Sequence, residues 1–248
     1  FVKINGSAAK TSYFYKKSKQ FFPNWKLIYK FKCTSTEYLL DEYLKLNNLK
    51  NIPIAIFSRS QSLGFGRYER KWFSPNGGIW FSAAYPIKSK TFISELFSIS
   101  IAYKLCEMLS EESINVSLKW PNDIFYGSKK LIGFLPKVVT RGEQTNYVRV
   151  GFGMNLNNKS PLKGISLCKI LNKKNLCESY WSSKILHVFN EAININKNRD
   201  LIIHGANRFL NKTYLPKEYI ENDWIIKNID SRGGLVISKD EDQKIINL

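Results

Sequence analysis

Histidine, methionine and cysteine are scarce in this sequence of 248 residues, which has two, two and four of them. Neither His187 nor His204 lies near a segment that resembles a functional motif, so chemistry that depends on a catalytic histidine is not indicated. The cysteines lack the close CxxC spacing of zinc and dithiol sites, and we expect reduced thiols. They are Cys33, Cys106, Cys168 and Cys177.

Long apolar runs are also absent. A bilayer requires roughly 20 consecutive apolar residues, and stretches such as Phe92–Tyr103 are interrupted by Ser, Glu or Lys. We therefore expect no membrane partner. Because the chain begins with Phe1 rather than Met, it is compatible with a processed product. We expect a protein of the cytoplasm, or of an organelle matrix if a targeting segment has been removed.

Acidic residues are few: 20 Asp and Glu stand against 38 Lys and Arg, a formal net charge of +18. Such a charge attracts nucleic acids, anionic membranes or acidic proteins over long range. The excess is mostly Lys beside abundant Asn and Ile, a bias that compositional drift also produces, so the charge alone identifies no partner. Hydrophobic residues make up 44% of the chain, which predicts a globular protein with one large domain or a domain with a small appendage.

The apolar spacing predicts an α/β domain over residues 25–212, a small β domain over 213–248, and a basic extension over 1–24 that lies on the surface or is partly disordered. Thr34 or Ser35 is expected to cap the first helix of the α/β domain. Strands are predicted over Trp25–Lys32, Ile52–Ser58, Gly78–Pro86, Val116–Trp120, Lys130–Val139 and Tyr147–Met154, helices over Phe92–Glu112, Tyr180–Asn194 and Asp200–Leu210, and two or three short strands over Trp224–Leu248.

Three parts of the sequence indicate chemistry. Gly64–Trp72 (GFGRYERKW) is a glycine-hinged loop whose cations and backbone N–H groups can close on an anion, and we expect the segment around it to be mobile. Lys119–Asp123 (KWPND), followed by Lys130–Gly133 (KLIG), puts a Lys at a strand end. Gly151–Asn157 (GFGMNLN) permits close approach to a flat ligand. Taken alone, the first and third parts are more typical of an ordinary loop or turn, and the second is as typical of a β-turn with one exposed Lys.

Taken in this order, the three parts resemble biotin protein ligases, with KWPND as the most specific element. The resemblance runs from Thr34 to Asn157 and continues more faintly to Leu248. It implies a mixed β-sheet with flanking helices, as in biotin/lipoate ligases and class II synthetases, plus a small C-terminal β appendage. It also implies biotin, ATP and Mg²⁺ as ligands and a carrier protein with an acceptor lysine as partner.

The resemblance further assigns individual residues. Lys119 and Arg67 are the implied catalytic residues. Biotin would be held by Ser35, Thr36, Gln61, Gly64, Gly66, Trp72, Lys119 and Gly133, and ATP by Arg67, Arg70, Lys71, Asn122, Asp123 and Asn155. No helix-turn-helix pattern precedes the first strand, so we expect no specific DNA binding, while a homodimer is left open.

Four residues depart from the family's usual pattern. Phe65 and Glu69 replace an Arg and a Gly of the loop, Glu37 replaces the Asn that commonly follows the Ser-Thr pair, and Lys137 stands at an often acidic position. The C-terminal appendage is shorter than usual. The leading hypothesis is an active biotin protein ligase, and the alternatives are a catalytically degenerate relative with a structural or nucleic-acid-associated role, or a lipoate ligase. KWPND and Gln61 argue against the lipoate ligase.

Overall fold

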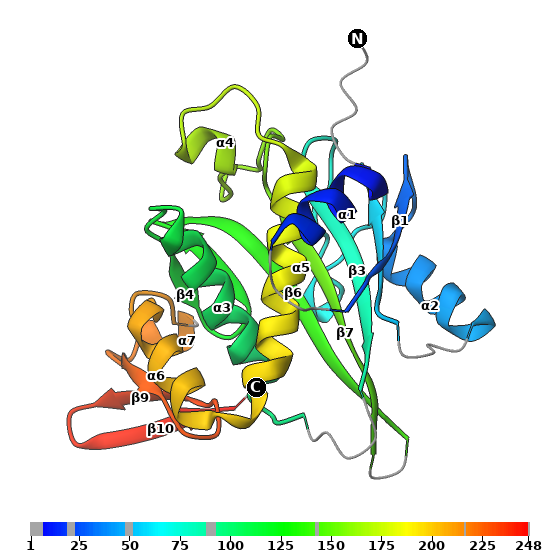
Figure 1. Cartoon of the computed structure of the whole chain (residues 1–248). Coiled ribbons are helices and arrows are strands. Elements are labelled where there is room, and N and C mark those ends of the chain that lie inside the picture. Colours follow the sequence, from blue (N-terminus) through cyan, green and yellow to red (C-terminus); the bar gives the residue numbers. More distant parts are fainter. Residues whose placement is uncertain are drawn as a thin grey trace.

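The central element of the fold is a seven-stranded mixed sheet (Figure 1). The computed structural model describes residues 7–18, 23–47, 52–87, 93–141, 144–215 and 217–247. Its strands lie in the order β1-β2-β3-β7-β6-β5-β4, and only the β1–β2 pair is parallel. The expected α/β fold with a mixed sheet is therefore confirmed. The strands are β1 (Lys26–Lys30), β2 (Ile54–Ser58), β3 (Ile79–Pro86), β4 (Ser117–Lys119), β5 (Asp123–Tyr126), β6 (Lys129–Arg141) and β7 (Gln144–Met154).

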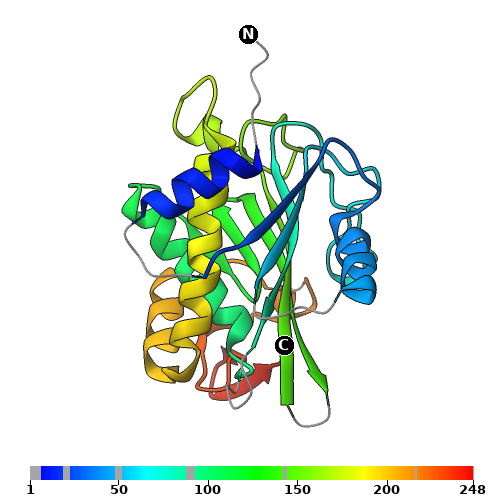
Figure 2. The same ribbon diagram turned by 45° about the vertical axis from the view of Figure 1, so that its right-hand side comes forward.

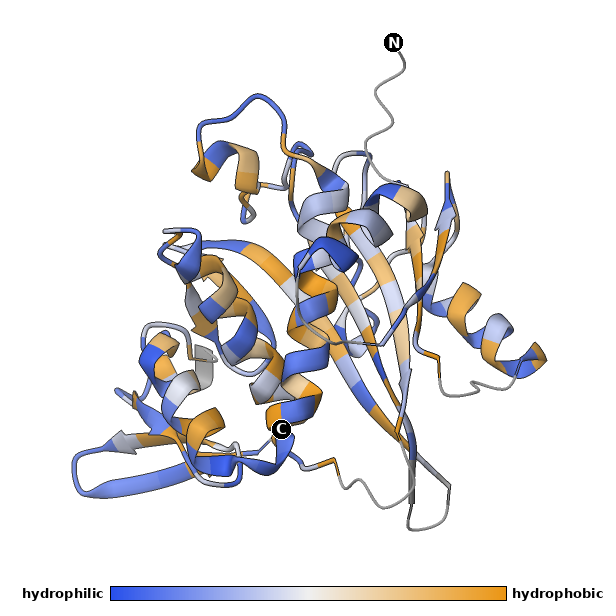
Figure 3. Cartoon of the chain, in the orientation of Figure 1, coloured by the Kyte–Doolittle hydropathy of each residue, from blue (hydrophilic) through white to orange (hydrophobic). Residues whose placement is uncertain are grey.

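The two faces of the sheet differ because alternate residues of a strand point to opposite sides. One face carries the buried rings of Phe57, Phe81, Phe134 and Phe152. Helices α3 (Phe97–Glu111) and α5 (Glu178–Asn194) cover the sheet on one side, and α2 (Thr36–Leu46) lies on the other (Figure 2). Colouring by hydropathy shows apolar residues along the central strands and polar residues toward the outer surfaces (Figure 3).

Part of the N-terminal extension is a helix, which was not predicted. Helix α1 (Ala8–Lys17) is capped by Ser7 and lies across α5. The Tyr15 ring stacks on His187 with 4.1 Å between ring centroids, and its hydroxyl accepts a hydrogen bond from Asn190 at 2.6 Å. Packing against a distant helix stabilises α1, although the local sequence lacks a clean helical period. The remaining residues of the extension before Pro23, 1–6 and 19–22, lie outside the described part of the chain.

Strand β5 was not predicted, because the KWPND motif was compatible with an ordinary turn after the predicted strand Val116–Trp120. Asp123 instead begins a strand that pairs with the start of β6 through a tight turn at Gly127, whose φ is +54°. A glycine adopts this left-handed conformation without the steric cost of a Cβ. The short helices α4 (Leu167–Ile170) and α7 (Lys217–Ile220) were also not predicted.

The C-terminal strands β8 (Ile225–Ile229), β9 (Leu235–Lys239) and β10 (Asp242–Ile246) form a small antiparallel sheet, as expected. The buried side chains of Ile226 and Ile237 belong to the same core as the central sheet. The domain boundary at residue 212 therefore stays a prediction.

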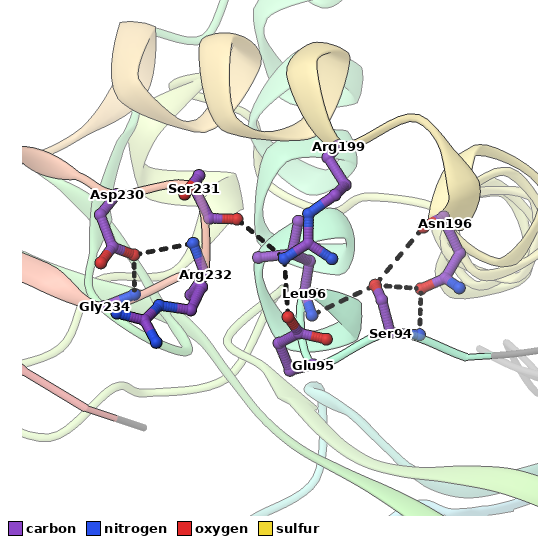
Figure 4. Close-up of polar contacts among 9 residues, drawn as sticks. All are labelled: Ser94, Glu95, Leu96, Asn196, Arg199, Asp230, Ser231, Arg232 and Gly234. Carbon is purple, nitrogen blue, oxygen red and sulfur yellow. Dashed lines mark hydrogen bonds and ion pairs between the residues drawn. The ribbon is translucent and has the colours of Figure 1, made fainter.

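Polar contacts tie this C-terminal sheet to the rest of the chain. Arg199, the first residue of α6 (Arg199–Phe209), reaches the Glu95 carboxylate at 2.7 Å and the Ser231 carbonyl oxygen at 3.1 Å (Figure 4). Near it, Ser94 bonds with Asn196 of the short 3₁₀ helix Ile195–Lys197. The start of α3, α6 and the turn after β8 are thus held together.

Among the residues that the structure describes, no helix is long and apolar enough to cross a membrane.

Candidate active site

A row of residues crosses the sheet from β4 to β7 on the face that α2 covers. The strand register pairs Lys119 with Asp123, Asp123 with Gly133, and Gly133 with Gly153. Residues paired across neighbouring strands point to the same side, and the three steps span about 14 Å at roughly 4.8 Å per step. The KWPND, KLIG and GFGMN motifs therefore meet on one surface.

The glycines of this surface leave room that other side chains occupy. A Cβ added at Gly153 would come within 2.6 Å of the Trp72 indole, and one at Gly133 within 2.9 Å of it. A Cβ at Gly151, two residues before Gly153, would lie 2.8 Å from the carboxylate of Glu37. Gly133, Gly151 and Gly153 are called the glycine floor below. Gly133 and Trp72, which the resemblance assigned to one site, lie against each other in the structure.

The loop over the glycine floor is a short hairpin. The backbone N–H of Trp72 donates to the Gly64 carbonyl oxygen at 2.8 Å, and the backbone N–H of Gly66 donates to the Arg70 carbonyl oxygen at 2.7 Å. Its tip includes the short 3₁₀ turn Arg67–Glu69, where Tyr68 and Glu69 have positive φ values of 55° and 56°. The sequence indicated a mobile loop that could not be regular over its whole length. It did not predict this hairpin. That the loop is mobile stays a prediction.

A hydrogen-bonded network lies beside the glycine floor at the N-terminus of α2. Ser35, one of the two predicted caps, caps α2. The Thr36 backbone N–H and hydroxyl both donate to Gln61 Oε1, at 2.8 and 3.0 Å. Gln61 Nε2 donates in turn to Ser74 at 2.9 Å, and Thr36 also bonds with Ser82 of β3. The structure thus brings the predicted biotin-binding residues Ser35, Thr36 and Gln61 together, and it adds Ser74 and Ser82, which no motif indicated.

Gly64 lies against this network. A Cβ there would be 2.7 Å from Ser74 Oγ and 2.8 Å from the Trp72 carbonyl oxygen, so a side chain does not fit without displacing the hairpin. Gly66 is less crowded, because its added Cβ would meet nothing closer than 3.6 Å. Phe65, between the two glycines, packs its ring 5.5 Å from that of Tyr38 on α2.

Cationic side chains gather at the opposite end of the row. Lys130 Nζ lies 2.5 Å from Asp123 Oδ1 and 4.6 Å above the Trp72 ring. Burial lowers the pKa of Lys130, Asp123 acts to raise it, and Lys119 and Arg70 lower it further. Lys119 and Arg70 thus both lie close enough to affect Lys130, and a group of cations with one carboxylate among them suits the binding of an anion such as a phosphate. Lys130 was not assigned a role from the sequence, although the KLIG motif begins with it.

Lys119 projects from the end of β4, as the sequence indicated. Its ammonium nitrogen lies 5.2 Å from the Phe125 ring centroid and 5.0 Å from that of Tyr214. Next to it, the Trp120 indole donates to the Gly233 carbonyl oxygen at 2.9 Å, which fixes the KWPND turn to the C-terminal sheet.

The remaining predicted ATP-binding residues are more scattered. Arg67 and Asn122 line a cavity of about 300 Å³ between the start of α3 and β6, which also includes Lys137. Asn122 Nδ2 donates to the Phe134 carbonyl oxygen at 2.6 Å, and the Asn155 side chain is buried between Asn158 and the Lys130 carbonyl oxygen. Arg70 is near Lys130, whereas the Lys71 side chain is exposed to solvent. The two Asn amides hold the backbone here, so their contacts with a nucleotide stay predictions.

Acidic, histidine and cysteine side chains do not form a group of three that could hold a metal ion anywhere in residues 7–18, 23–47, 52–87, 93–141, 144–215 and 217–247. All four cysteines are free thiols.

The profile of the Biotin/lipoate A/B protein ligase family matches residues 28–155, more than half of the chain. The chain belongs to this family. The matched range contains every residue assigned from the sequence to biotin or ATP, and it ends at Asn155, close to the limit that the motifs indicated.

The family's curated relatives are longer than the part that matches. The chain is 29% identical over 139 residues to the bifunctional ligase/repressor BirA of Bacillus spizizenii, a match that covers 54% of this chain and 41% of that protein. It is 27% identical over 135 residues to the human biotin–protein ligase, covering 52% and 19%. The match to the chloroplastic biotin–protein ligase 1 of Arabidopsis thaliana, at 22% identity, covers 79% and 59%.

Solved structures of the family share the fold over nearly the whole chain. A biotin protein ligase from Aquifex aeolicus in complex with biotin and ATP superposes with a TM-score of 0.71 at 24% identity, covering 90% of this chain and 96% of that one. The Leishmania major enzyme in complex with biotinyl-5-AMP gives a TM-score of 0.60 at 19% identity, covering 92% and 99%. The expected biotin/lipoate ligase-like fold is thereby confirmed.

Proposed function

We propose that this chain is a biotin protein ligase, which forms biotinyl-5'-AMP from biotin and ATP and transfers the biotinyl group to a lysine of a carrier protein. One observation carries the proposal: a single sheet face joins the Ser35–Thr36–Gln61 network to the Lys119–Lys130–Arg70 cations across the glycine floor. An elongated acid bound there has its head at α2 and its carboxylate beside the cations. The relatives named as biotin–protein ligases and the ligase structures with biotin and ATP support this assignment.

The first half-reaction depends on charge and position rather than on a general base. A carboxylate oxygen of biotin attacks the α-phosphorus of ATP, a P–O bond forms, and pyrophosphate leaves with the electrons of the broken P–O bond. Lys119, as the proposed catalytic lysine, lies where the carboxylate and the α-phosphate must meet. Arg67 and Arg70, on the hairpin above, neutralise phosphate charge as the hairpin closes.

Mg²⁺ fits this scheme through one side chain of the row. Asp123 has its carboxylate at the cationic end, 2.5 Å from Lys130 and partly exposed. Mg²⁺ is usually held in proteins by one or two carboxylates together with substrate phosphates and water, so Asp123 is the residue that would hold it. When bound, the ion supplies further neutralisation of phosphate charge.

The second half-reaction takes its nucleophile from the partner. The acceptor lysine amine attacks the carbonyl carbon of the mixed anhydride, an amide N–C bond forms, AMP leaves with the electrons of the broken C–O bond, and the nitrogen releases a proton to water. A net charge of +18 favours encounter with an acidic carrier domain.

ATP–pyrophosphate exchange, measured with biotin and then with lipoate, tests the proposal. We expect exchange with biotin and little with lipoate. Exchange with lipoate alone would instead favour a lipoate ligase. No exchange with either acid, together with no binding of biotin or ATP at millimolar concentration, would contradict the ligase assignment. It would favour a catalytically degenerate relative, the alternative suggested by Phe65 and Glu69 in the loop.

A further inference from the structure

Three buried polar atoms on this face of the sheet lack a hydrogen-bond partner among the described residues, and one of them is the Nε donor of Arg149. The other two are Glu37 Oε1, an acceptor, and Trp72 Nε1, a donor. Glu37 lies over Gly151 and Trp72 over Gly153. These glycines are same-face neighbours on β7, about 7 Å apart at roughly 3.3 Å per residue. Buried polar groups are normally satisfied, so a ligand that reaches these atoms is expected to carry polar atoms of both kinds.

The Glu37 carboxylate is held in place by its other oxygen. Oε2 lies 2.7 Å from Nη2 of Arg149, and Nη1 of the same guanidinium lies 2.5 Å from Asp41. Arg149 is a β7 residue with a side chain only 9% exposed. Burial acts to lower the pKa of Arg149, but Glu37 and Asp41 outweigh it and the pKa is raised.

The charge of this cluster is unbalanced. Two carboxylates share one guanidinium, so the cluster formed by Glu37, Asp41 and Arg149 keeps one net negative charge when all three are ionised. The free Oε1 that carries part of this charge is turned toward the floor at Gly151. An ionised carboxylate accepts hydrogen bonds and donates none. A ligand that reaches Oε1 must therefore present an N–H or O–H group to it.

The position of Glu37 along the glycine floor determines which part of a bound ligand it contacts. Glu37 directly follows Ser35 and Thr36 in α2, whereas Lys119 and Lys130 lie at the far end of the row. If the ligand's carboxylate lies at the cations, as the proposed function requires, its head lies at Glu37. The head of biotin is a cyclic urea with two N–H groups. The heads of lipoate and of simple fatty acids have none.

On this basis, and resting on the proposed function, we propose that Glu37 determines substrate specificity: Oε1 accepts a hydrogen bond from a urea N–H of biotin and disfavours acids with apolar heads. Binding an apolar head against Oε1 would keep this oxygen desolvated and unpaired, which is costly. A site built to hydrogen-bond one substrate rejects an analogue that lacks the group. Glu37 therefore distinguishes biotin from lipoate, the two acids named in the description of the family.

Glu37→Gln tests the proposal with little change of shape. The Gln oxygen can keep the contact with Arg149, while its NH₂ group replaces Oε1 and faces the urea N–H with a second donor. We expect the Kd for biotin to rise about ten- to hundredfold, the range for one hydrogen bond to a charged group. The Kd for octanoate, which has the carboxylate and an alkyl chain but no N–H, should stay the same or fall. Both are measured by calorimetric titration at low salt.

Asp41→Asn is the matched control, because it removes the other carboxylate from Arg149 and leaves Oε1 in place. We expect it to bind both acids within threefold of the parent. Equal losses of biotin and octanoate in Glu37→Gln would overturn the proposal, since they would mean that Glu37 only supports the fold. So would a biotin Kd within threefold of the parent. If the parent itself binds octanoate but not biotin, the proposed function fails and this inference fails with it.

Discussion

The indole of Trp72 lies over Gly153, and a Cβ added to that glycine would come within 2.6 Å of the indole nitrogen. The contact joins the hairpin to the GFGMN motif, since Gly153 lies 81 positions after Trp72 in the chain. The hairpin and the sheet therefore form two sides of one site, and changes on either side should alter ligand binding.

Gly153→Ala should displace Trp72 from the floor. Overpacking of this kind costs about 1–3 kcal/mol, and because Trp72 lies on a short hairpin, the strain should fall on the site more than on the core. We expect the affinity for biotin to fall at least about tenfold, with a modest decrease in thermal stability. Titration calorimetry and thermal unfolding measure the two effects. Unchanged biotin affinity would mean that Trp72 does not face the ligand.

Lys119→Ala should abolish adenylation and leave the fold intact. The ammonium group of Lys119 makes aromatic contacts with Phe125 and Tyr214 and lies outside the hydrophobic core. ATP–pyrophosphate exchange with biotin is the measurement, with the circular dichroism spectrum as a check of folding. Lys129→Ala, an exposed lysine at the start of β6, is the matched control and should keep its activity. Activity of Lys119→Ala within threefold of the parent would remove Lys119 from the mechanism.

Glu69→Gly should stabilise the free protein. Glu69 has φ +56°, in the left-handed region, where a non-glycine residue costs about 1–2 kcal/mol. Part of this gain is offset because glycine makes the unfolded chain more flexible, by about 0.5–1 kcal/mol. The expected net increase in the free energy of unfolding is about 0.5–1 kcal/mol, measured by denaturant titration. A decrease would show that the Glu69 side chain makes a stabilising contact.

Phe65→Arg combined with Glu69→Gly should tighten biotin binding. The double change restores a cation and removes an anion in the hairpin above the floor. The expected gain is about 1–3 kcal/mol, the value of one charge-assisted contact. Titration of biotin and then ATP into parent and variant must use the same low salt, because screening hides part of the difference. Since Phe65 packs against Tyr38, Phe65→Leu separates the loss of that contact from the gain of charge.

Glu178 should make stability depend on pH near neutrality. Burial raises the pKa of this α5 carboxyl from 4.5 to about 7, and the Arg59 charge opposes the shift. Between these two values the folded protein holds a proton that the unfolded chain has lost. The free energy of unfolding should therefore fall as pH rises from about 4.5 to 7, by about 3 kcal/mol, and then level off.

Glu178→Gln should remove this dependence and be the more stable protein at pH 8. Chemical unfolding of parent and variant at pH 5, 6, 7 and 8 measures it. Parallel pH profiles for the two proteins would show that Glu178 titrates normally in the fold.

Much of this protein could be predicted from the sequence by itself. Alternating apolar residues indicated most of the central strands, Ser35 marked the start of α2, and the order of GFGRYERKW, KWPND, KLIG and GFGMN indicated the family. These features are local: a strand needs its own period of two, a cap needs only the next residues, and a motif is read within a few positions.

Other features were decided only by the tertiary structure, because they depend on residues far apart in the chain. Helix α1 is stabilised by α5, and no local period predicts that contact. The register that aligns Lys119, Asp123, Gly133 and Gly153 follows from the pairing of four strands, and a slip of one residue would turn each side chain to the other face. Glu37 was a mere departure from a pattern until the fold brought it to Arg149, 112 positions away, and left one of its oxygens free above Gly151.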